Sequence, residues 1–471
     1  MNMFSIIACF LINTPKVNNE VWAWGYNKKG EIGDSTTTDR WQPVKINIQS
    51  NITAISAGQE HSLAIKSDST ILAWGWNTNG QLGDGTNANR WQPVQTNILT
   101  NVDAITGASM QTLALKSNGT VWGWGYNTEG QLGDGTTDDR WQPVQTNSMT
   151  NVIAIAGGGL HSLALKSDST VWAWGLNDCG QLGIGGDDAD PHPTPEKINT
   201  LTNILAIAGG ELHSLALKSD STVWAWGYNG NGQLGDSTTN KRSQPVRTNI
   251  LTGVIAIAGG GSHSLALKSD GTVWAWGCNS GGQLGDSTTT QHLQPVQTNI
   301  LTGITAIAAG KSHSLALKSD GTVWAWGENS KGQLGVNDTV DHWQPVRTNI
   351  LTDVTAITGR GDHSLAIKNS AGIENRETVA SFYLNISTVI CKNSFYVKYG
   401  IQKSKTNGEF SVSLKLYDIS GKVKKVLFED NSLCGKYNIN INLSDFSSGV
   451  YFLRLDAGTR YITKKLAIIK N

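Results

Sequence analysis

The sequence contains few cysteines, no long apolar segment and no excess charge of either sign. Its five cysteines lack the CxxC spacing and neighbouring histidines of zinc or thioredoxin-like sites. The odd number predicts no disulfide framework, and whether Cys391 and Cys434 pair stays open. No apolar run is long enough to cross a bilayer as a helix, so we expect no transmembrane segment. P-loop, Rossmann, nucleophile-elbow and HExxH fingerprints are also missing, so we expect no cofactor and no catalytic residue.

Charge is sparse and unevenly distributed. Only 16% of residues are charged, with 37 Lys+Arg against 37 Asp+Glu. Residues 374–471 carry 15 basic and 8 acidic residues, which leaves 22 basic and 29 acidic residues in the remainder. Nucleic-acid binding depends mainly on neutralising phosphates. The large acidic part therefore predicts no nucleic-acid partner.

The first twenty residues leave two interpretations open. Phe4–Ile12 is an apolar run of the length found in secretory signals, but it lacks a basic region before it and a clear cleavage site after it. Residues 1–20 are therefore either a signal peptide or the product of a start codon placed too far upstream.

A repeat of about 50 residues dominates the rest of the chain. The element WxWG occurs seven times, with Leu72 replacing one tryptophan, and HSLAxK occurs six times, with QTLALK at Gln111 in the second place. Within one unit, "VIAIAGG", "HSLALK" and "TVWAWG" alternate as strands do, and "QPVQTN" follows a polar loop. Four strands per repeat are typical of a propeller blade. The small residues of "AIAGG" favour the innermost strand, and the paired tryptophans favour packing between blades.

The phase of the repeat predicts how the ring closes. The array begins with an unpartnered "VWAWG" (Val21–Gly25) and ends with an unpartnered "HSLAIK" (His363–Lys368). We expect these halves to form one composite blade, which joins six continuous blades in a seven-bladed, all-β ring over residues 21–370.

The amino-acid sequence of the repeat also resembles that of a known family. The stretch "GYNTEGQLGDGTT" (Gly125–Thr137) is similar to the repeat of the regulator of chromosome condensation family, a seven-bladed propeller, and the likeness covers about residues 20 to 370. "WxWGxN…GQLG" is also similar to bacterial secreted members, including a propeller that inhibits β-lactamases. The eukaryotic founder exchanges nucleotide on a small GTPase and docks on nucleosomes. This chain lacks a basic N-terminal tail and a long wedge-like insertion, so the resemblance implies a binding propeller, with a nucleotide-exchange factor as the weaker alternative.

The last hundred residues have a different composition. After a linker at 371–381, "SLKLYDISGKVKKVLFEDN" (Ser413–Asn431) and "GKYNININLSDFSSGVYFLRLDAG" (Gly435–Gly458) alternate as short strands of a small β-sandwich. Residues 382–471 resemble the C-terminal sorting domain of type IX secretion substrates, although the usual "PNP" is missing. The resemblance implies a secreted or surface-displayed protein of a Gram-negative bacterium, outer-membrane secretion machinery as a partner, and a signal peptide. An accessory adhesive sandwich is the alternative.

The repeated histidine, lysine and aspartate are predicted to be structural. A ring of seven identical catalytic centres is implausible, and Gln111 cannot act as an acid or base near neutral pH.

Tryptophans that differ between repeats are better candidates for a binding site. Four of them precede "QPV", whereas units four to six hold Thr194, Ser243 and Leu293 there. In a closed ring the four lie on successive blades, and three follow an arginine. Loop Trp and Arg residues are common interface anchors, and Trp also stacks on sugars. The expected ligand-binding residues are Arg40, Trp41, Arg90, Trp91, Arg140, Trp141 and Trp343. The alternative is that each tryptophan only covers its own blade edge.

The fourth loop is the other departure from the repeat. It concentrates Asp187, Asp188 and Asp190, but their spacing fits no EF-hand, so a solvated loop is favoured over a calcium site. We expect a monomeric module that binds an extracellular protein or glycan; an extracellular lyase or hydrolase is the alternative.

Overall fold

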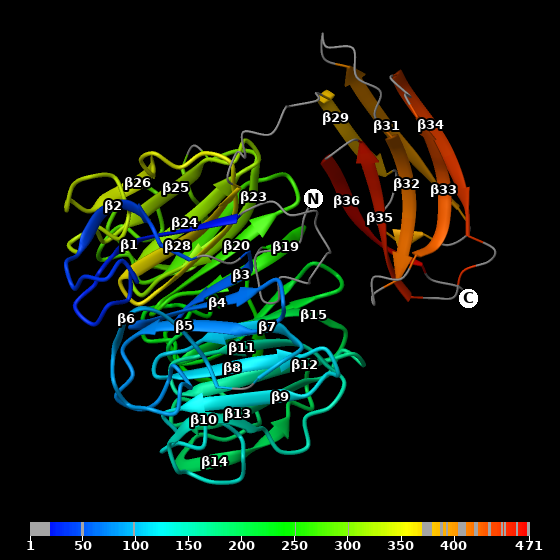
Figure 1. Cartoon of the computed structure of the whole chain (residues 1–471). Coiled ribbons are helices and arrows are strands. Elements are labelled where there is room, and N and C mark those ends of the chain that lie inside the picture. The colour runs from blue at the N-terminus through cyan, green and yellow to red at the C-terminus, as the bar shows by residue number, and fades with distance from the viewer. Residues whose placement is uncertain are drawn as a thin grey trace. The chain divides into compact units, whose positions relative to one another are not determined.

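The repeats form seven antiparallel four-stranded sheets in the computed structural model (Figure 1). The structure describes residues 19–369 other than 49–50, 98, 250 and 300. It also describes residues 379–468 other than 387–389, 392–393, 404–410, 419–422, 432–434, 444–445, 447–448 and 458–459. Each sheet is one blade, so the expected all-β propeller is confirmed. The described part of the chain contains no helix long and apolar enough to span a membrane.

The blades are numbered along the chain, each from its inner to its outer strand. Blade 1 consists of β27 (Val354–Arg360), β28 (His363–Asn369), β1 (Asn19–Gly25) and β2 (Arg40–Lys45). Blade 2 consists of β3 (Ile52–Ala57), β4 (His61–Lys66), β5 (Ile71–Gly75) and β6 (Arg90–Gln95). Blade 3 consists of β7 (Val102–Gly107), β8 (Gln111–Lys116), β9 (Val121–Gly125) and β10 (Arg140–Gln145). Blade 4 consists of β11 (Val152–Gly157), β12 (His161–Lys166), β13 (Val171–Asn177) and β14 (Asp188–Lys197). Blade 5 consists of β15 (Ile204–Gly209), β16 (His213–Lys218), β17 (Val223–Gly227) and β18 (Arg242–Arg247). Blade 6 consists of β19 (Val254–Gly259), β20 (His263–Lys268), β21 (Val273–Gly277) and β22 (His292–Gln297). Blade 7 consists of β23 (Ile304–Ala309), β24 (His313–Lys318), β25 (Val323–Gly327) and β26 (His342–Arg347).

Blade 1 is the composite blade that closes the ring. Strand β1 pairs with β28 in an unbroken antiparallel register that runs from Asn19 opposite Asn369 to Gly25 opposite His363. The inner strand β27 contacts both β23 and β3, so the inner strands make a continuous circle. The expected composite closure is therefore confirmed, and β1 begins at Asn19, two residues before the expected start at 21.

Small residues line the axis because neighbouring inner strands approach one another closely. A Cβ atom added to Gly107 would lie 2.6 Å from the backbone nitrogen of Gly58 in the preceding blade. One added to Gly209 would lie 2.6 Å from the carbonyl oxygen of Gly157. A side chain at either place would separate the blades, which explains the "AIAGG" pattern.

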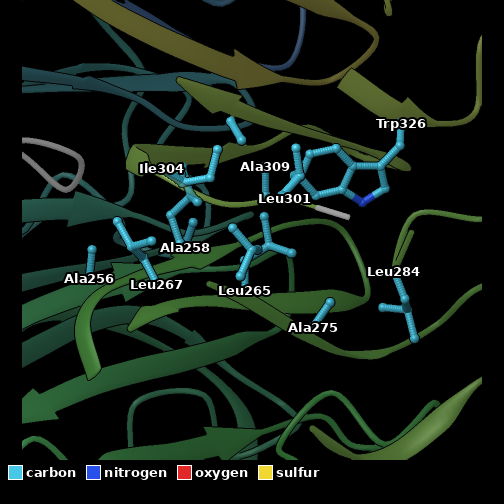
Figure 2. Packing of buried hydrophobic residues seen from close by; sticks show 13 residues of the cluster. Ala256, Ala258, Leu265, Leu267, Ala275, Leu284, Leu301, Ile304, Ala309 and Trp326 are labelled. Carbon is cyan, nitrogen blue, oxygen red and sulfur yellow. The ribbon is translucent and has the colours of Figure 1, made fainter. Parts of the chain in front are cut away.

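The second tryptophan of each WxWG motif is fully buried between blades. In Figure 2, Trp326 of blade 7 packs with the apolar cluster of blade 6 that includes Leu265 and Ala275. Its indole N–H also donates to the carbonyl of Gln283 at 2.9 Å. The first tryptophan is only partly buried, and at Trp274 the Lys268 ammonium lies 5.5 Å from the ring centroid.

The C-terminal part is a separate compact unit made of two sheets. One sheet has the order β29-β31-β34, and the other has the order β30-β36-β35-β32-β33. Their bounds are β29 (Val379–Ile386), β30 (Ile390–Cys391), β31 (Ser394–Lys403), β32 (Ser411–Asp418), β33 (Val423–Asn431), β34 (Gly435–Asn442), β35 (Gly449–Ala457) and β36 (Arg460–Ile468). Both sheets contribute to one core, with Leu384 and Val397 from the first and Leu414 and Leu453 from the second.

Parts of the sequence-based expectations lie outside the described residues. These are the expected signal segment apart from its last two residues, most of the expected linker, and Cys434. Strand β29 begins three residues before the expected domain boundary at 382.

Candidate functional site

One side of the ring carries most of the irregular structure, and we call it the loop face. It holds the turns between the first and second strands of each blade and the long loops between the third and fourth strands. The fourth strand begins at this side, because Arg40, Arg90 and Arg140 pair with the glycine that ends WxWG. Residues at the start of the outer strands therefore lie at the rim of the loop face.

The four variable tryptophans occupy this rim. Each is the second residue of an outer strand, and the exposed fractions are 51% for Trp41, 54% for Trp91, 47% for Trp141 and 49% for Trp343. Each contacts a glycine in the loop of the preceding blade: Trp343 on Gly282, Trp41 on Gly332, Trp91 on Gly30 and Trp141 on Gly80. They therefore lie on blades 7, 1, 2 and 3 without interruption, and we call them the tryptophan arc.

The fold does not require tryptophan at these positions. In blades 4, 5 and 6 the equivalent glycines Gly130, Gly180 and Gly232 face Pro193, Ser243 and Leu293. The backbone hydrogen bond between adjacent blades is also the same with and without tryptophan. The N–H of Gly135 donates to the carbonyl of Pro193 at 2.9 Å, as the N–H of Ser35 donates to the carbonyl of Trp91 at 2.9 Å. The sequence comparison placed Thr194 here instead. The structure shifts this by one residue, because His192 pairs with Gly175 in the register that Arg140 keeps with Gly125.

The three arginines beside the arc are held inside their own loops. Arg90 forms an ion pair with Asp84 at 2.7 Å and donates to Thr86 at 3.2 Å. Burial acts to raise the pKa of Asp84, but hydrogen bonds from Thr86 and Arg90 outweigh it and the pKa is lowered. Arg40 and Arg140 repeat the pairing with Asp34 and Asp134. Arg242 does so in blade 5, where the arc is absent, so this cation stabilises blades in general.

The acidic fourth loop is held by ion pairs within blade 4 and to blade 5. Asp187 forms an ion pair with Lys241, and His192 lies between Asp188 at 3.0 Å and Glu196 at 2.6 Å. Burial acts to lower the pKa of His192, but the two carboxylates outweigh it and the pKa is raised. Asp190 is exposed. Within the described ranges no group of three His, Cys, Asp or Glu side chains is arranged to hold a metal ion.

The repeated histidines are buried links between blades. The Nε2 atom of His263 lies 3.1 Å from the hydroxyl of Ser314 in the next blade. Lys268 covers Trp274, and Asp270 accepts hydrogen bonds from the backbone and hydroxyl of Thr272 at the hairpin turn. Each member of this set therefore has a packing role.

The structure adds aromatic residues that sequence reasoning treated as unremarkable. The residue after WxWG is partly exposed on the loop face, and it is Tyr26, Trp76 and Tyr126 on blades 1, 2 and 3. Burial, followed by the carboxylates of Glu31 and Glu60, raises the pKa of Tyr26, so its phenol stays neutral. These three residues and the tryptophan arc form what we call the aromatic sector. The other four blades hold Leu176, Tyr228, Cys278 and Glu328 at this position, so blade 5 carries one aromatic residue there outside the sector. The run of three aromatic residues on adjacent blades was the available signal.

Comparison with known proteins follows the two parts of the chain. The family model of the regulator of chromosome condensation (RCC1) repeat matches residues 18–65, 68–115 and 118–165, and a second model of the same repeat matches residues 52–81. The family model of the RCC1-like domain matches residues 144–373. The chain belongs to the RCC1 repeat family. Residues 391–470 match the secretion system C-terminal sorting domain. Both expected resemblances are confirmed. The sorting domain indicates a secreted or cell-surface protein of Bacteroidetes-type bacteria.

Solved structures share the propeller fold. Human WBSCR16 is 21% identical with a TM-score of 0.68, covering 75% of this chain and 100% of that one. Yeast RCC1 (Prp20), solved bound to Kap60, is 22% identical with a TM-score of 0.70, covering 79% and 94%. Prp20p from Saccharomyces cerevisiae, described with its binding properties to Gsp1p and histones, is 23% identical with a TM-score of 0.68, covering 79% and 97%. No curated protein matches the chain. RCC1-like propellers are in general non-catalytic binding or exchange-factor modules.

Proposed function

We propose that the RCC1-repeat propeller is an extracellular binding module that holds a protein ligand against its aromatic sector. The observation that carries this proposal is the tryptophan arc. Four indoles remain about half exposed on successive blades, although Pro, Ser or Leu satisfies the same backbone position in the other three. Large exposed aromatic side chains gathered on one surface are typical of interaction sites rather than of folding requirements.

The extent of the aromatic sector favours a protein over a single sugar. It runs from the rim, at Trp91 and Trp141, inward to Trp76 and Tyr126 on the same blades. Tyrosine and tryptophan bury a large area on binding at low conformational cost. Beside Trp343 the surface is also slightly hollowed, with Asp341 and Gln344 at its edge. Sugars stack on tryptophan too, so a glycan is the second candidate ligand.

The decisive variant replaces Trp91 and Trp141 by alanine in one chain. Its matched control replaces Ser243 and Leu293, which occupy the same backbone position on the opposite side of the ring. Immobilised propeller is incubated with the extracellular milieu, and bound material is treated with protease or with glycosidases. We expect capture of a protease-sensitive ligand by the control and by the unaltered chain, at least tenfold reduced in the tryptophan variant.

Thermal melting of the three proteins separates binding from folding. The proposal requires melting temperatures that agree within about 3 °C, since surface substitutions change stability little. Equal capture by all three proteins, or a large loss of melting temperature only in the tryptophan variant, would refute it. A ligand that survives protease but not glycosidases would assign the site to a glycan.

We also propose that the chain reaches the cell exterior through the outer-membrane secretion machinery. The sorting domain supports this route. Cell fractionation with intact-mass measurement tests it, because the mass reports removal of residues at each end. A full-length chain in the cytosol would contradict the proposal.

A further inference from the structure

Arg360 breaks the repeat at the centre of the ring. The equivalent residue is glycine or alanine in the six other blades: Gly58, Ala108, Gly158, Gly210, Gly260 and Gly310. Strand β27 also continues one residue further than the other inner strands, so that Arg360 pairs with His363. One long cationic side chain therefore emerges where every other blade has almost none.

The Arg360 side chain crosses the mouth of the central channel. Its Nη1 atom donates to the carbonyl of Gly157 at 2.8 Å. Gly157 ends β11 in blade 4, and the inner strands follow one another in the order β27, β3, β7 and β11. The arginine thus spans from blade 1 to the opposite side of the ring. It remains partly accessible at the loop face.

The charge of this guanidinium is poorly compensated. It has five N–H groups, and no carboxylate among the described residues lies within 4.0 Å of it. Burial lowers the pKa of Arg360 to about 10, and the attraction of Glu211 only partly opposes this. Lys311 adds a second cation to the same mouth, where it also attracts the carboxylates of Glu60 and Asp362. Glu211 is the carboxylate that acts on Arg360 itself.

A small cavity lies beside these cations. Its volume is about 20 Å³, and its walls include Gly260, Gly261 and Gly310 together with Arg360, Lys311 and Glu211. A space of this size holds one water-sized group. The glycines leave it open to backbone and guanidinium groups without side chains between them.

We propose that the channel mouth is a receptor for one small monovalent anionic group, a halide or a carboxylate, with Arg360 as the principal donor and Lys311 as the second cation. A guanidinium with spare donors in a partly desolvated site is a strong partner for such groups. The two sources are a free ion from solution and a carboxylate carried by a ligand on the loop face.

The test measures excess ³⁵Cl NMR line width with the purified full chain, which reports bound chloride directly. We expect broadening that formate displaces. Substituting Arg360→Gly, the residue that five other blades carry at the equivalent position, should abolish the broadening. Lys311→Gln should weaken binding by about threefold, and Arg247→Gln on an outer strand is the control that should change nothing.

Glu211→Gln makes the test independent of folding. Removing this carboxylate should strengthen chloride binding by about threefold, and a misfolded protein would not produce that gain. To distinguish the two sources, a short peptide with a free C-terminal carboxylate is compared with its amide. Displacement of chloride by the acid form alone shows that the mouth accepts a carboxylate carried on a chain, and displacement by formate alone restricts the site to free ions.

Two results would overturn the proposal: no excess broadening in the unaltered chain, or broadening that persists in both Arg360→Gly and Arg360→Gln. The result of the chloride test does not depend on the proposed function, because the measurement needs no protein or glycan ligand. The Trp91 and Trp141 substitutions should leave chloride binding unchanged.

Discussion

The Nε2 atom of His363 lies 2.9 Å from the Oγ atom of Ser62, where the last strand of the ring meets the first continuous blade. The Ser62 hydroxyl gives its own hydrogen to the carbonyl of Glu31 at 2.7 Å, so the imidazole must be the donor to Ser62. This fixes a proton on Nε2, and burial, which lowers the pKa of His363 to about 4, keeps the imidazole neutral near pH 7. The same link from histidine to a hydroxyl of the next blade recurs at His61, His161, His213, His263 and His313.

Two serines allow the strength of one link to be measured. Ser214 accepts from His161 and donates to the carbonyl of Gln181, whereas Ser162 donates to the carbonyl of Gln131 at a junction where Gln111 replaces the histidine. Ser214→Ala leaves a buried imidazole N–H without an acceptor, and Ser162→Ala does not. We expect Ser214→Ala to cost about 1–2 kcal/mol more in the free energy of unfolding. Denaturant titration with equal slopes provides the comparison, and equal losses would mean that the histidine contributes nothing.

The glutamine at position 111, where the other six blades have histidine, has a steric explanation that a paired substitution can test. A Cβ atom on Gly58, Gly158, Gly210, Gly260 or Gly310 would overlap the imidazole three residues later, and blade 3 has Ala108 at that place. Blade 1 combines Arg360 with His363, but there β27 runs one residue further and pairs the two residues, so its backbone differs at this point. We expect Gln111→His to destabilise the protein by about 1–3 kcal/mol, and Ala108→Gly added to it to recover most of that loss. A double-mutant cycle with additive effects would show that the two positions are independent.

Acid should destabilise the ring through its histidines. Burial lowers the pKa to about 3 for His61, His161, His213 and His313 and to about 4 for His263 and His363. Unfolded histidines take up protons below pH 6.5, so the stability present above that pH is lost progressively as the pH falls toward 4. Each histidine contributes about 1.4 kcal/mol per pH unit. Melting temperatures from pH 7 to 5 should fall less steeply in His213→Gln, and an unchanged slope would contradict this assignment.

Glu31 has the opposite pH dependence. It replaces the glutamine of "GQLG", is fully buried, and has one carboxylate oxygen without a hydrogen-bond partner. Burial raises the pKa of Glu31 to about 8. The free energy of unfolding therefore decreases as the pH rises from about 4.5 to 8. Glu31→Gln should stabilise the protein by about 1–3 kcal/mol at pH 8 and by much less at pH 5. A pH-independent difference would show that Glu31 is not protonated in the folded protein.

The sequence predicts the ring well because its signal is repeated. WxWG and HSLAxK each recur every 50 to 52 residues, and their phase alone indicates that β1 and β28 share a blade. The candidate site was harder, because it depends on residues that do not repeat. Trp91 and Trp141 could be singled out by comparing copies, but the ion pair that occupies Arg90 required the fold of its loop. Arg360 stood one residue before a turn in a stretch that reads as strand, and only the closed ring shows that it faces Gly157.

The composite blade also makes the assembly sensitive to chain completeness. Asn19 and Asn369 are opposite each other, so β1 has no inner partner until β28 has been synthesised. A chain that stops anywhere before β28 keeps open sheet edges in blade 1 and at its neighbours, which favours aggregation and proteolysis. The residues that finish the ring directly precede the sorting domain. A chain that contains the sorting domain has therefore already synthesised every strand that is needed to close the propeller ring.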